Sequence, residues 1–175
     1  VSVEMSPAQA ALYRRMYSKV PSFLQRKLEA GSSLSRAELA RMTAFMTGPR
    51  QVGLSTLPFD KGGDPAAAFD SSPKLTEAMR RLKTTLDADP AAKGLVFSNF
   101  IDAGLTPYQA ALDRAGIPAA TFSGKLTDPQ RKDLVDRYNA GKLRVALLGP
   151  SGTEGLSFAG TRLVQLLDPH WNDAR

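Results

Sequence analysis

Four short apolar runs in the second half of the chain constrain its fold more than any other feature. They span residues 94–98, 119–122, 144–148 and 163–167. Two stretches of helical periodicity, 106–116 and 127–141, separate the first three runs. Buried strands that alternate with amphipathic helices of about 10–15 residues are typical of a parallel sheet with right-handed crossovers. The sequence therefore predicts an α/β fold in which helices flank a parallel sheet.

The beginning of the chain predicts a different structure, a helical segment over residues 1–52. Two Ser-x-x-Gln/Glu patterns, starting at Ser6 and Ser35, read as capping boxes. Such a box pairs the first and fourth residues through their side chains, so that free backbone N–H groups at a helix start are satisfied. The Gly48-Pro49 pair is expected to end the helix that begins after Ser35.

Residues 53–72 are expected to form a linker, because Gly, Pro and Asp are frequent there and periodicity is weak. Ser72-Pro73 then opens a helix with a clear apolar stripe. The predicted organisation is thus a basic helical segment (1–52), a linker (53–72) and an α/β domain (73–175).

The positive charge is concentrated in the helical segment. The formal net charge is +6, and residues 1–50 hold eight Lys/Arg against three Asp/Glu, which gives +5. A basic surface favours nucleic acid, although a solvated helix surface explains the same residues.

Composition excludes several classes of protein. The chain has no cysteine, which excludes a disulfide scaffold and a thiolate metal site, and His170 is its only histidine, so we expect no metal site. No apolar run approaches the roughly 20 residues that span a membrane. We expect an intracellular, cytoplasmic protein without membrane contact.

Four polar loops should meet at one edge of the sheet, because the carboxyl ends of parallel strands share an edge, and ligands collect there. They are residues 98–100, 123–125, 149–158 and 168–172. Small residues, free amides and hydroxyls suit contacts with a phosphodiester backbone. Polar loops also occur without any ligand, so a purely structural role stays open. Within the third loop, Glu154 could bond a ribose, orient a cation or cap a short helix over 155–158.

These runs resemble the second RecA-like domain of superfamily 2 helicases and translocases, in particular the Snf-type branch and related phage and viral helicases. The sequence GLVFSNF resembles motif IV, and Phe122-Ser123-Gly124 with Arg131 resembles the element between motifs IV and V. ALLGPSGTEGLSF followed by VQLLDPHWN resembles motif V and its trailing D-P-x-W-N signature.

The resemblance implies a nucleic-acid site and a site that couples it to ATP, with no catalytic residue in this chain. Residues matching the family's nucleic-acid contacts are Ser98, Asn99, Gly124, Lys125, Ser151, Gly152 and Thr153. Residues matching its coupling element are Glu154, Gly155 and Leu156. The implied partners are DNA, with RNA as the alternative, and a first RecA-like domain of the same polypeptide. ATP and Mg²⁺ are the implied cofactors of the intact protein.

Parts of the ATPase machinery are missing from this sequence. It contains no G-x-x-x-x-G-K-[ST] phosphate loop. Motif VI, with its arginine finger, is expected soon after Arg175, and such an arginine contributes roughly 10³–10⁵ in rate in comparable enzymes. We therefore expect the chain alone to lack ATPase activity.

Two alternatives stay open at this stage. The P-S-x-x-E-G pattern from Pro150 to Gly155 also resembles the donor-binding loop of nucleotide-sugar glycosyltransferases. Those enzymes usually carry a second glutamate seven residues later, where this chain has Thr161. The other alternative is a non-catalytic module that binds nucleic acid or protein.

Overall fold

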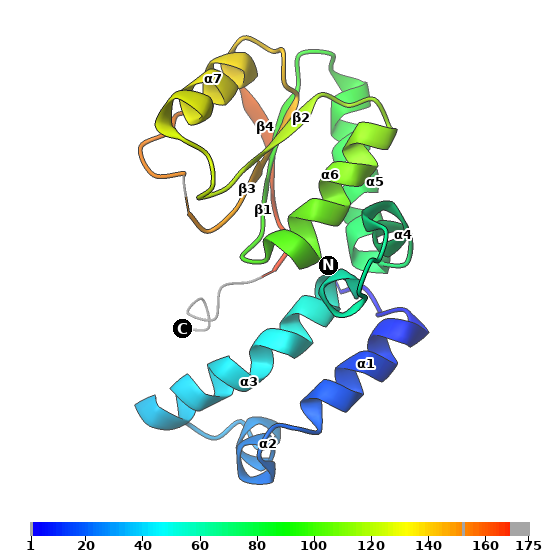
Figure 1. Cartoon of the computed structure of the whole chain (residues 1–175), viewed down its shortest axis with the longest axis vertical. Helices are drawn as coiled ribbons and strands as arrows, with labels where there is room; N and C mark the ends of the chain where they lie inside the picture. Colours follow the sequence, from blue (N-terminus) through cyan, green and yellow to red (C-terminus); the bar gives the residue numbers. More distant parts are fainter. Residues whose placement is uncertain (1, 152, 169–175) are drawn as a thin grey trace.

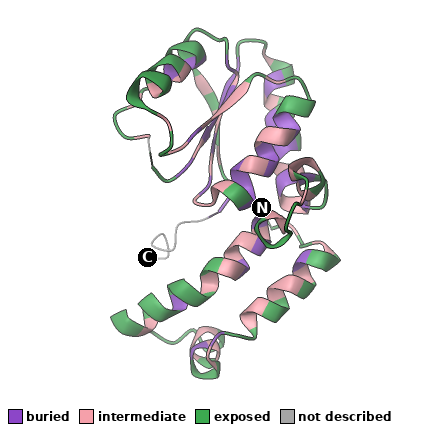
Figure 2. Ribbon diagram, in the orientation of Figure 1, coloured by how far each residue is buried: buried purple, intermediate pink, exposed green. Residues whose placement is uncertain are grey.

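The computed structural model describes residues 2–151 and 153–168. It has two parts, a sheet with helices on both faces and an arm of three helices that extends away from the sheet (Figure 1). Most buried residues belong to the part with the sheet, whereas the arm is mainly exposed or half-buried (Figure 2). Within the described ranges, no helix combines the length and hydropathy needed to cross a membrane.

The sheet has four parallel strands in the order β2-β3-β1-β4. They are β1 (Lys93–Phe97), β2 (Ala119–Phe122), β3 (Val145–Leu148) and β4 (Thr161–Leu166). All four apolar runs therefore form strands, and the predicted α/β fold is confirmed.

Helices cover the sheet on both faces and create two cores. The helices are α5 (Pro73–Ala88), α6 (Thr106–Arg114) and α7 (Asp128–Asn139), and a π-helical turn, η2 (Ile101–Leu105), leads into α6. Along β3, Val145 and Leu147 pack in the core with α5 and α6, whereas Ala146 packs in the core with α7. This alternation follows from the period of two along a strand, which sends successive side chains to opposite faces.

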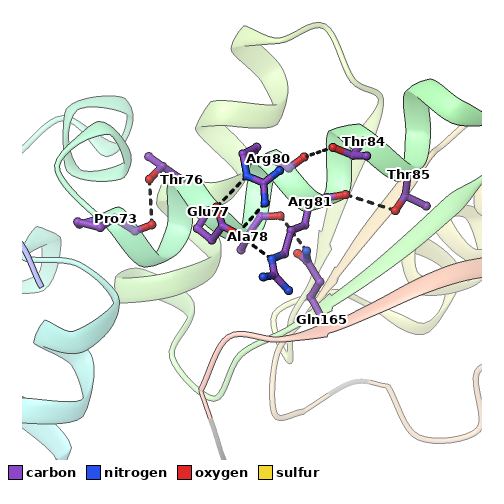
Figure 3. A network of polar contacts seen from close by, with 9 residues as sticks. All are labelled: Pro73, Thr76, Glu77, Ala78, Arg80, Arg81, Thr84, Thr85 and Gln165. Atoms are coloured by element: carbon purple, nitrogen blue, oxygen red, sulfur yellow. Dashed lines mark hydrogen bonds and ion pairs between the residues drawn. The ribbon is translucent and has the colours of Figure 1, made fainter. Parts of the chain in front are cut away.

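The edge strand β4 is fixed to the helices by a half-buried polar bridge. The hydroxyl of Tyr108 in α6 donates to Gln165 Oε1 at 2.9 Å, and Gln165 Nε2 donates to the carbonyl of Ala78 in α5 at 2.8 Å. Figure 3 shows the Gln165 side chain reaching α5. On the other face of β4, Val164 and Leu166 are 61% and 66% exposed.

The arm consists of α1 (Pro7–Tyr17), α2 (Ser22–Glu29) and α3 (Arg36–Leu54), which we call the helical arm. It has a small core of its own around Val20, Leu24 and Met42. Both predicted capping boxes are present: in each, the N-cap serine accepts from the N3 backbone and the N3 side chain accepts from the N-cap backbone. The predicted helical character of residues 1–52 is therefore confirmed.

The predicted end of α3 at Gly48-Pro49 is wrong, because the helix continues through Pro49 to Leu54. A proline inside a helix removes one backbone hydrogen bond and usually costs about 3 kcal/mol. Here Pro49 and Val52 are buried. The side chain of Gln9 in α1 donates to the carbonyl oxygens of Val52 and Leu54, at 2.8 and 3.3 Å. Tertiary packing thus offsets the cost of the proline.

The segment predicted as a linker, residues 53–72, contains ordered structure. It holds the end of α3, a 3-10 turn, η1 (Leu57–Phe59), and a short helix, α4 (Pro65–Asp70). Phe69 packs edge-on against Tyr108, with ring centroids 6.2 Å apart. A helix of six residues is too short to produce a periodic apolar pattern, so periodicity does not predict α4.

We expect Tyr108→Phe to destabilise the fold by about 0.5–1.5 kcal/mol, because it removes the hydrogen bond between the Tyr108 hydroxyl and the half-buried Gln165 side chain. Urea unfolding followed by circular dichroism measures this difference. Tyr13→Phe is the matched control, since the Tyr13 hydroxyl makes no hydrogen bond within the described residues. Equal unfolding free energies for the two variants would contradict the bridge.

The arm should depend on pH through Glu38. Lys27 Nζ donates to Glu38 at 2.7 and 2.9 Å, and this bond together with the Ser35 backbone N–H lowers the Glu38 pKa from 4.5 to about 2. A lowered pKa means that the stabilisation is complete above pH 4.5 and is lost as the pH falls through about 2. Glu38→Gln should therefore lower the melting temperature at pH 7 and have little effect near pH 2. A difference that stays constant over this range would refute the assignment.

Candidate nucleic-acid interface

The four strands end at the same level of the sheet. Phe97 lies opposite both Leu148 and Leu166, and Leu148 also lies opposite Phe122. The loops that follow the strands therefore emerge side by side along one edge. The predicted convergence of the four polar loops is confirmed for the parts of them that the structure describes.

Asp168, the residue two positions beyond β4, connects two of these loops. It is 4% exposed. The hydroxyl of Ser98 donates to its Oδ1 at 2.5 Å, and Asn99 Nδ2 donates to its Oδ2 at 2.7 Å. The backbone N–H of Asn99 donates to the same carboxylate at 3.1 Å. These bonds fix the loop after β1 on the end of β4.

Two cations from other helices compensate the buried carboxylate. Arg50 of α3 lies 3.7 Å from Asp168 Oδ2, and its guanidinium stands 5.2 Å from the centre of the Phe100 ring. Burial lowers the pKa of Lys74 at the start of α5, and attraction to Asp168 opposes that shift. The group formed by Asp168, Ser98, Asn99, Arg50 and Lys74, here called the Asp168 cluster, therefore ties the helical arm and α5 to the loop edge.

Sequence reasoning missed the roles of Arg50 and Lys74. Arg50 was one of eight cations in a basic segment, and nothing local distinguishes it from the other seven. In the sequence, Asp168 belongs to the fourth polar loop and to the D-P-x-W-N signature, and neither pattern predicts its partners. An ion pair between residues so far apart in the chain leaves no periodic trace in the sequence.

The loops after β2 and β3 touch each other. A Cβ atom added to Gly124 would lie only 2.7 Å from the Ser151 hydroxyl oxygen, so a side chain at this position would force that hydroxyl to move. Lys125 beside it is exposed. The predicted residues Gly124, Lys125 and Ser151 are thus neighbours on one surface.

The loop over residues 149–160 begins on the sheet and turns at its tip. The backbone N–H of Gly149 donates to the carbonyl of Phe122 at 3.0 Å. The tip is a turn closed by a bond of 3.4 Å from the Leu156 N–H to the Thr153 carbonyl, and Gly155 has a φ of 74°. Residues 155–158 are not helical, so the third of the roles left open for Glu154, the capping of a short helix there, is excluded.

The predicted site residues differ in accessibility. Ser98 is buried with its hydroxyl on Asp168, and Asn99, Thr153 and Leu156 are half-buried. The exposed ones are Gly124, Lys125, Ser151, Glu154 and Gly155. Glu154 has no hydrogen-bond or ion-pair partner among the described residues. Gly152, His170 and Trp171 lie outside the described residues.

No metal centre is visible in the ranges that the structure describes, since no three His, Asp or Glu side chains gather there in a way that could hold an ion. The carboxylate of Asp168 already accepts hydrogen bonds from Ser98 and Asn99. What the edge offers instead is a set of small polar groups and backbone amides, which is the kind of surface that contacts a phosphate backbone.

Comparison with known proteins places this geometry in a family. The family described as "Helicase conserved C-terminal domain" matches residues 77–175. A protein of Acanthamoeba polyphaga mimivirus named as an ATP-dependent RNA helicase is 26% identical over 110 residues, which is 63% of this chain and 24% of that protein. The DNA repair protein RAD5 of Cryptococcus neoformans is 32% identical over 107 residues, or 59% of this chain and 9% of that protein. The chain thus spans less than a quarter of the length of these relatives.

Solved structures share the fold along nearly the whole chain. The C-terminal domain of the Sulfolobus solfataricus SWI2/SNF2 ATPase superposes with a TM-score of 0.70 at 19% identity, covering 98% of this chain and 71% of that one. The core of this ATPase in complex with dsDNA gives a TM-score of 0.72 at 18% identity, covering 97% of this chain and 34% of that one. The C-terminal part of the Fun30 ATPase domain gives 0.71 at 15% identity, covering 95% and 73%.

These matches do not favour the glycosyltransferase alternative. They agree with the resemblance to motifs IV and V, and the shared architecture includes the helical arm as well as the sheet. The chain belongs to the helicase conserved C-terminal domain family, and it shares the fold of the C-terminal domain of the Sulfolobus solfataricus SWI2/SNF2 ATPase.

Proposed function

We propose that the chain is the half of an ATP-dependent DNA helicase or translocase that grips the nucleic acid and completes the ATP site. The observation that carries this proposal is the row of four loops at one sheet edge, with Asn99 held on Asp168 and Gly124 in contact with Ser151. Membership of the helicase C-terminal family supports the same conclusion.

The nucleic-acid contacts would be made to the phosphodiester backbone. Asn99 is fixed on Asp168 and half-buried, so it would meet a phosphate without a large loss of side-chain entropy. Gly124 and Ser151 let a backbone approach closely, and Lys125 adds a positive charge. Thr153 and Gly152 would complete the surface, and Ser98 would act through Asp168 and its backbone. Contacts of this kind carry no base information and weaken with salt.

The ATP part of the proposal rests on the loop tip. Glu154, Gly155 and Leu156 would transmit the nucleotide state to the nucleic-acid surface. ATP and Mg²⁺ would be held mainly by a first RecA-like domain of the same polypeptide, since this sequence has no phosphate loop. We propose the same division as above, with a basic helical segment (1–52), a connecting segment (53–72) and the RecA-like domain (73–175), in an intracellular protein associated with nucleic acid.

DNA is the proposed partner, and RNA is the alternative to be tested. The two relatives described above are named for different nucleic acids, one as an RNA helicase and one as a DNA repair protein. The dsDNA complex of the Sulfolobus solfataricus ATPase core supports DNA for this fold.

We expect the chain to bind DNA weakly, with an affinity that falls about tenfold or more between 50 and 200 mM salt. Asn99→Ala and Thr153→Ala should each weaken binding by about three- to tenfold, because each removes a polar contact to phosphate. Fluorescence anisotropy with labelled DNA, and with RNA of the same sequence, measures this. Thr84→Ala, on the exposed face of α5 (Figure 3), is the control and should bind as the wild type does. Unchanged affinity in both test variants would refute the assigned surface.

The chain on its own should not hydrolyse ATP, with or without DNA. The reason is that a phosphate cradle, its Mg²⁺ and an arginine finger are all needed for phosphoryl transfer. A phosphate-release assay at saturating ATP checks this expectation. Hydrolysis by the pure chain that disappears in Glu154→Ala would contradict it.

A further inference from the structure

The last turn of α7 holds the descending part of the 149–160 loop through one side chain. Asn139 Nδ2 donates to the carbonyl of Ser157 at 3.0 Å, and Asn139 Oδ1 accepts from the backbone N–H of Ala159 at 2.8 Å. The side-chain amide of Asn139 thus hydrogen-bonds the loop backbone on both sides of Phe158. Its carbonyl and its NH₂ group are both used, as a neighbouring strand would use its backbone groups.

Phe158, between these two bonds, is packed into the core under α7. Its ring meets Phe122 of β2 and Tyr138 of α7 edge-on, with both centroid distances at 5.3 Å. Tyr138 is itself held, since its hydroxyl lies 2.7 Å from Thr161 Oγ1 and its carbonyl accepts from Lys93 Nζ at 2.9 Å. The end of the loop is therefore anchored to the sheet and to α7.

The tip of the same loop has little support of its own. Ser151, Glu154 and Gly155 are exposed, and the only backbone bond across the tip within the described residues is the weak one of 3.4 Å described above. The bond from Gly149 to Phe122 fixes the tip at one end. At the other end, Asn139 fixes it through its bonds to the Ser157 carbonyl and the Ala159 N–H.

A hollow separates the tip from α7, lined by Asp128, Arg131, Asn139, Glu154 and Leu156 among others. Asn139 thus links α7 to the loop at the side of this hollow. Without that link, the tip would have room to move into the hollow. Without the two Asn139 bonds, only the packing of Phe158 would hold the descending part of the loop on α7. The backbone on both sides of Phe158 would then be freer, and so would the tip with Thr153 and Glu154.

We infer that Asn139 is a positioning residue: it sets the 149–160 loop so that Thr153 and Ser151 face the nucleic acid. It makes no contact with the ligand itself. This inference rests on the proposed function, since it names the residue that holds the proposed surface in place. The sequence motifs do not indicate this role, because β3 separates Asn139 from the loop along the chain.

The chemistry of an amide is required at this position. Asn139→Ala removes both bonds. Asn139→Asp keeps an acceptor for the Ala159 N–H but brings a negative oxygen toward the Ser157 carbonyl, where a donor is needed. We therefore expect the two variants to fail in different ways, with only the Asp variant retaining protection of the Ala159 amide.

The test uses the full chain and two measurements. Hydrogen exchange of the Ala159 amide, followed by NMR, should be about tenfold faster in Asn139→Ala than in the wild type, because its acceptor is gone. DNA affinity by anisotropy should fall about fivefold or more in the same variant. The control is Gln109→Ala, which removes another neutral amide that bonds a backbone carbonyl, Ala119, on the far side of the domain. Gln109→Ala should leave the Ala159 exchange rate and the DNA affinity at their wild-type values, even if it lowers the free energy of unfolding as much as Asn139→Ala does.

The outcomes separate this inference from the proposed function. Unchanged Ala159 exchange in Asn139→Ala overturns the inference, and so does faster exchange with wild-type DNA affinity. A wild-type chain without DNA affinity overturns the proposed function, and the exchange comparison, which needs no DNA, then decides the positioning role alone. If Gln109→Ala lost as much DNA affinity as Asn139→Ala, general destabilisation would explain the loss, and the inference would also be overturned.

Discussion

The arrangement of the loop edge depends on one buried carboxylate, that of Asp168. It accepts hydrogen bonds from Ser98 and Asn99 and lies near the cations of Arg50 and Lys74. A buried carboxylate without such partners would be strongly unfavourable. Loss of any one partner would therefore destabilise the fold, which keeps the partner residues in this arrangement. The cluster therefore joins the end of β4, the loop after β1, the start of α5 and the helical arm into one unit.

The parallel sheet provides the frame for that cluster. Because the four strands end at the same level, their loops lie in a row, and small residues allow the loops to touch. Phosphate contacts need such a row more than they need any single side chain, since they are made by amides, hydroxyls and one or two cations. The 149–160 loop of this row is also held on α7, by the hydrogen bonds of Asn139 and by the packing of Phe158 on Tyr138.

The helical arm is part of the same architecture. Its own core is small, but Gln9 bonds the end of α3 and Arg50 reaches the Asp168 cluster. The shared fold with the Sulfolobus solfataricus domain covers 98% of the chain, so the arm is included in it. The helical arm and the sheet with its loop edge thus form one connected structure (Figure 1).

Periodicity and local hydrogen bonding were enough to predict the parallel sheet, its flanking helices and the capping boxes. The convergence of the four loops then followed from the common direction of parallel strands. Tertiary structure alone decided the continuation of α3 through Pro49, the short helix α4, the partners of Asp168 and the grip of Asn139 on the loop. These features join residues far apart in the chain, and a buried side chain finds such a partner only after the fold has brought both together.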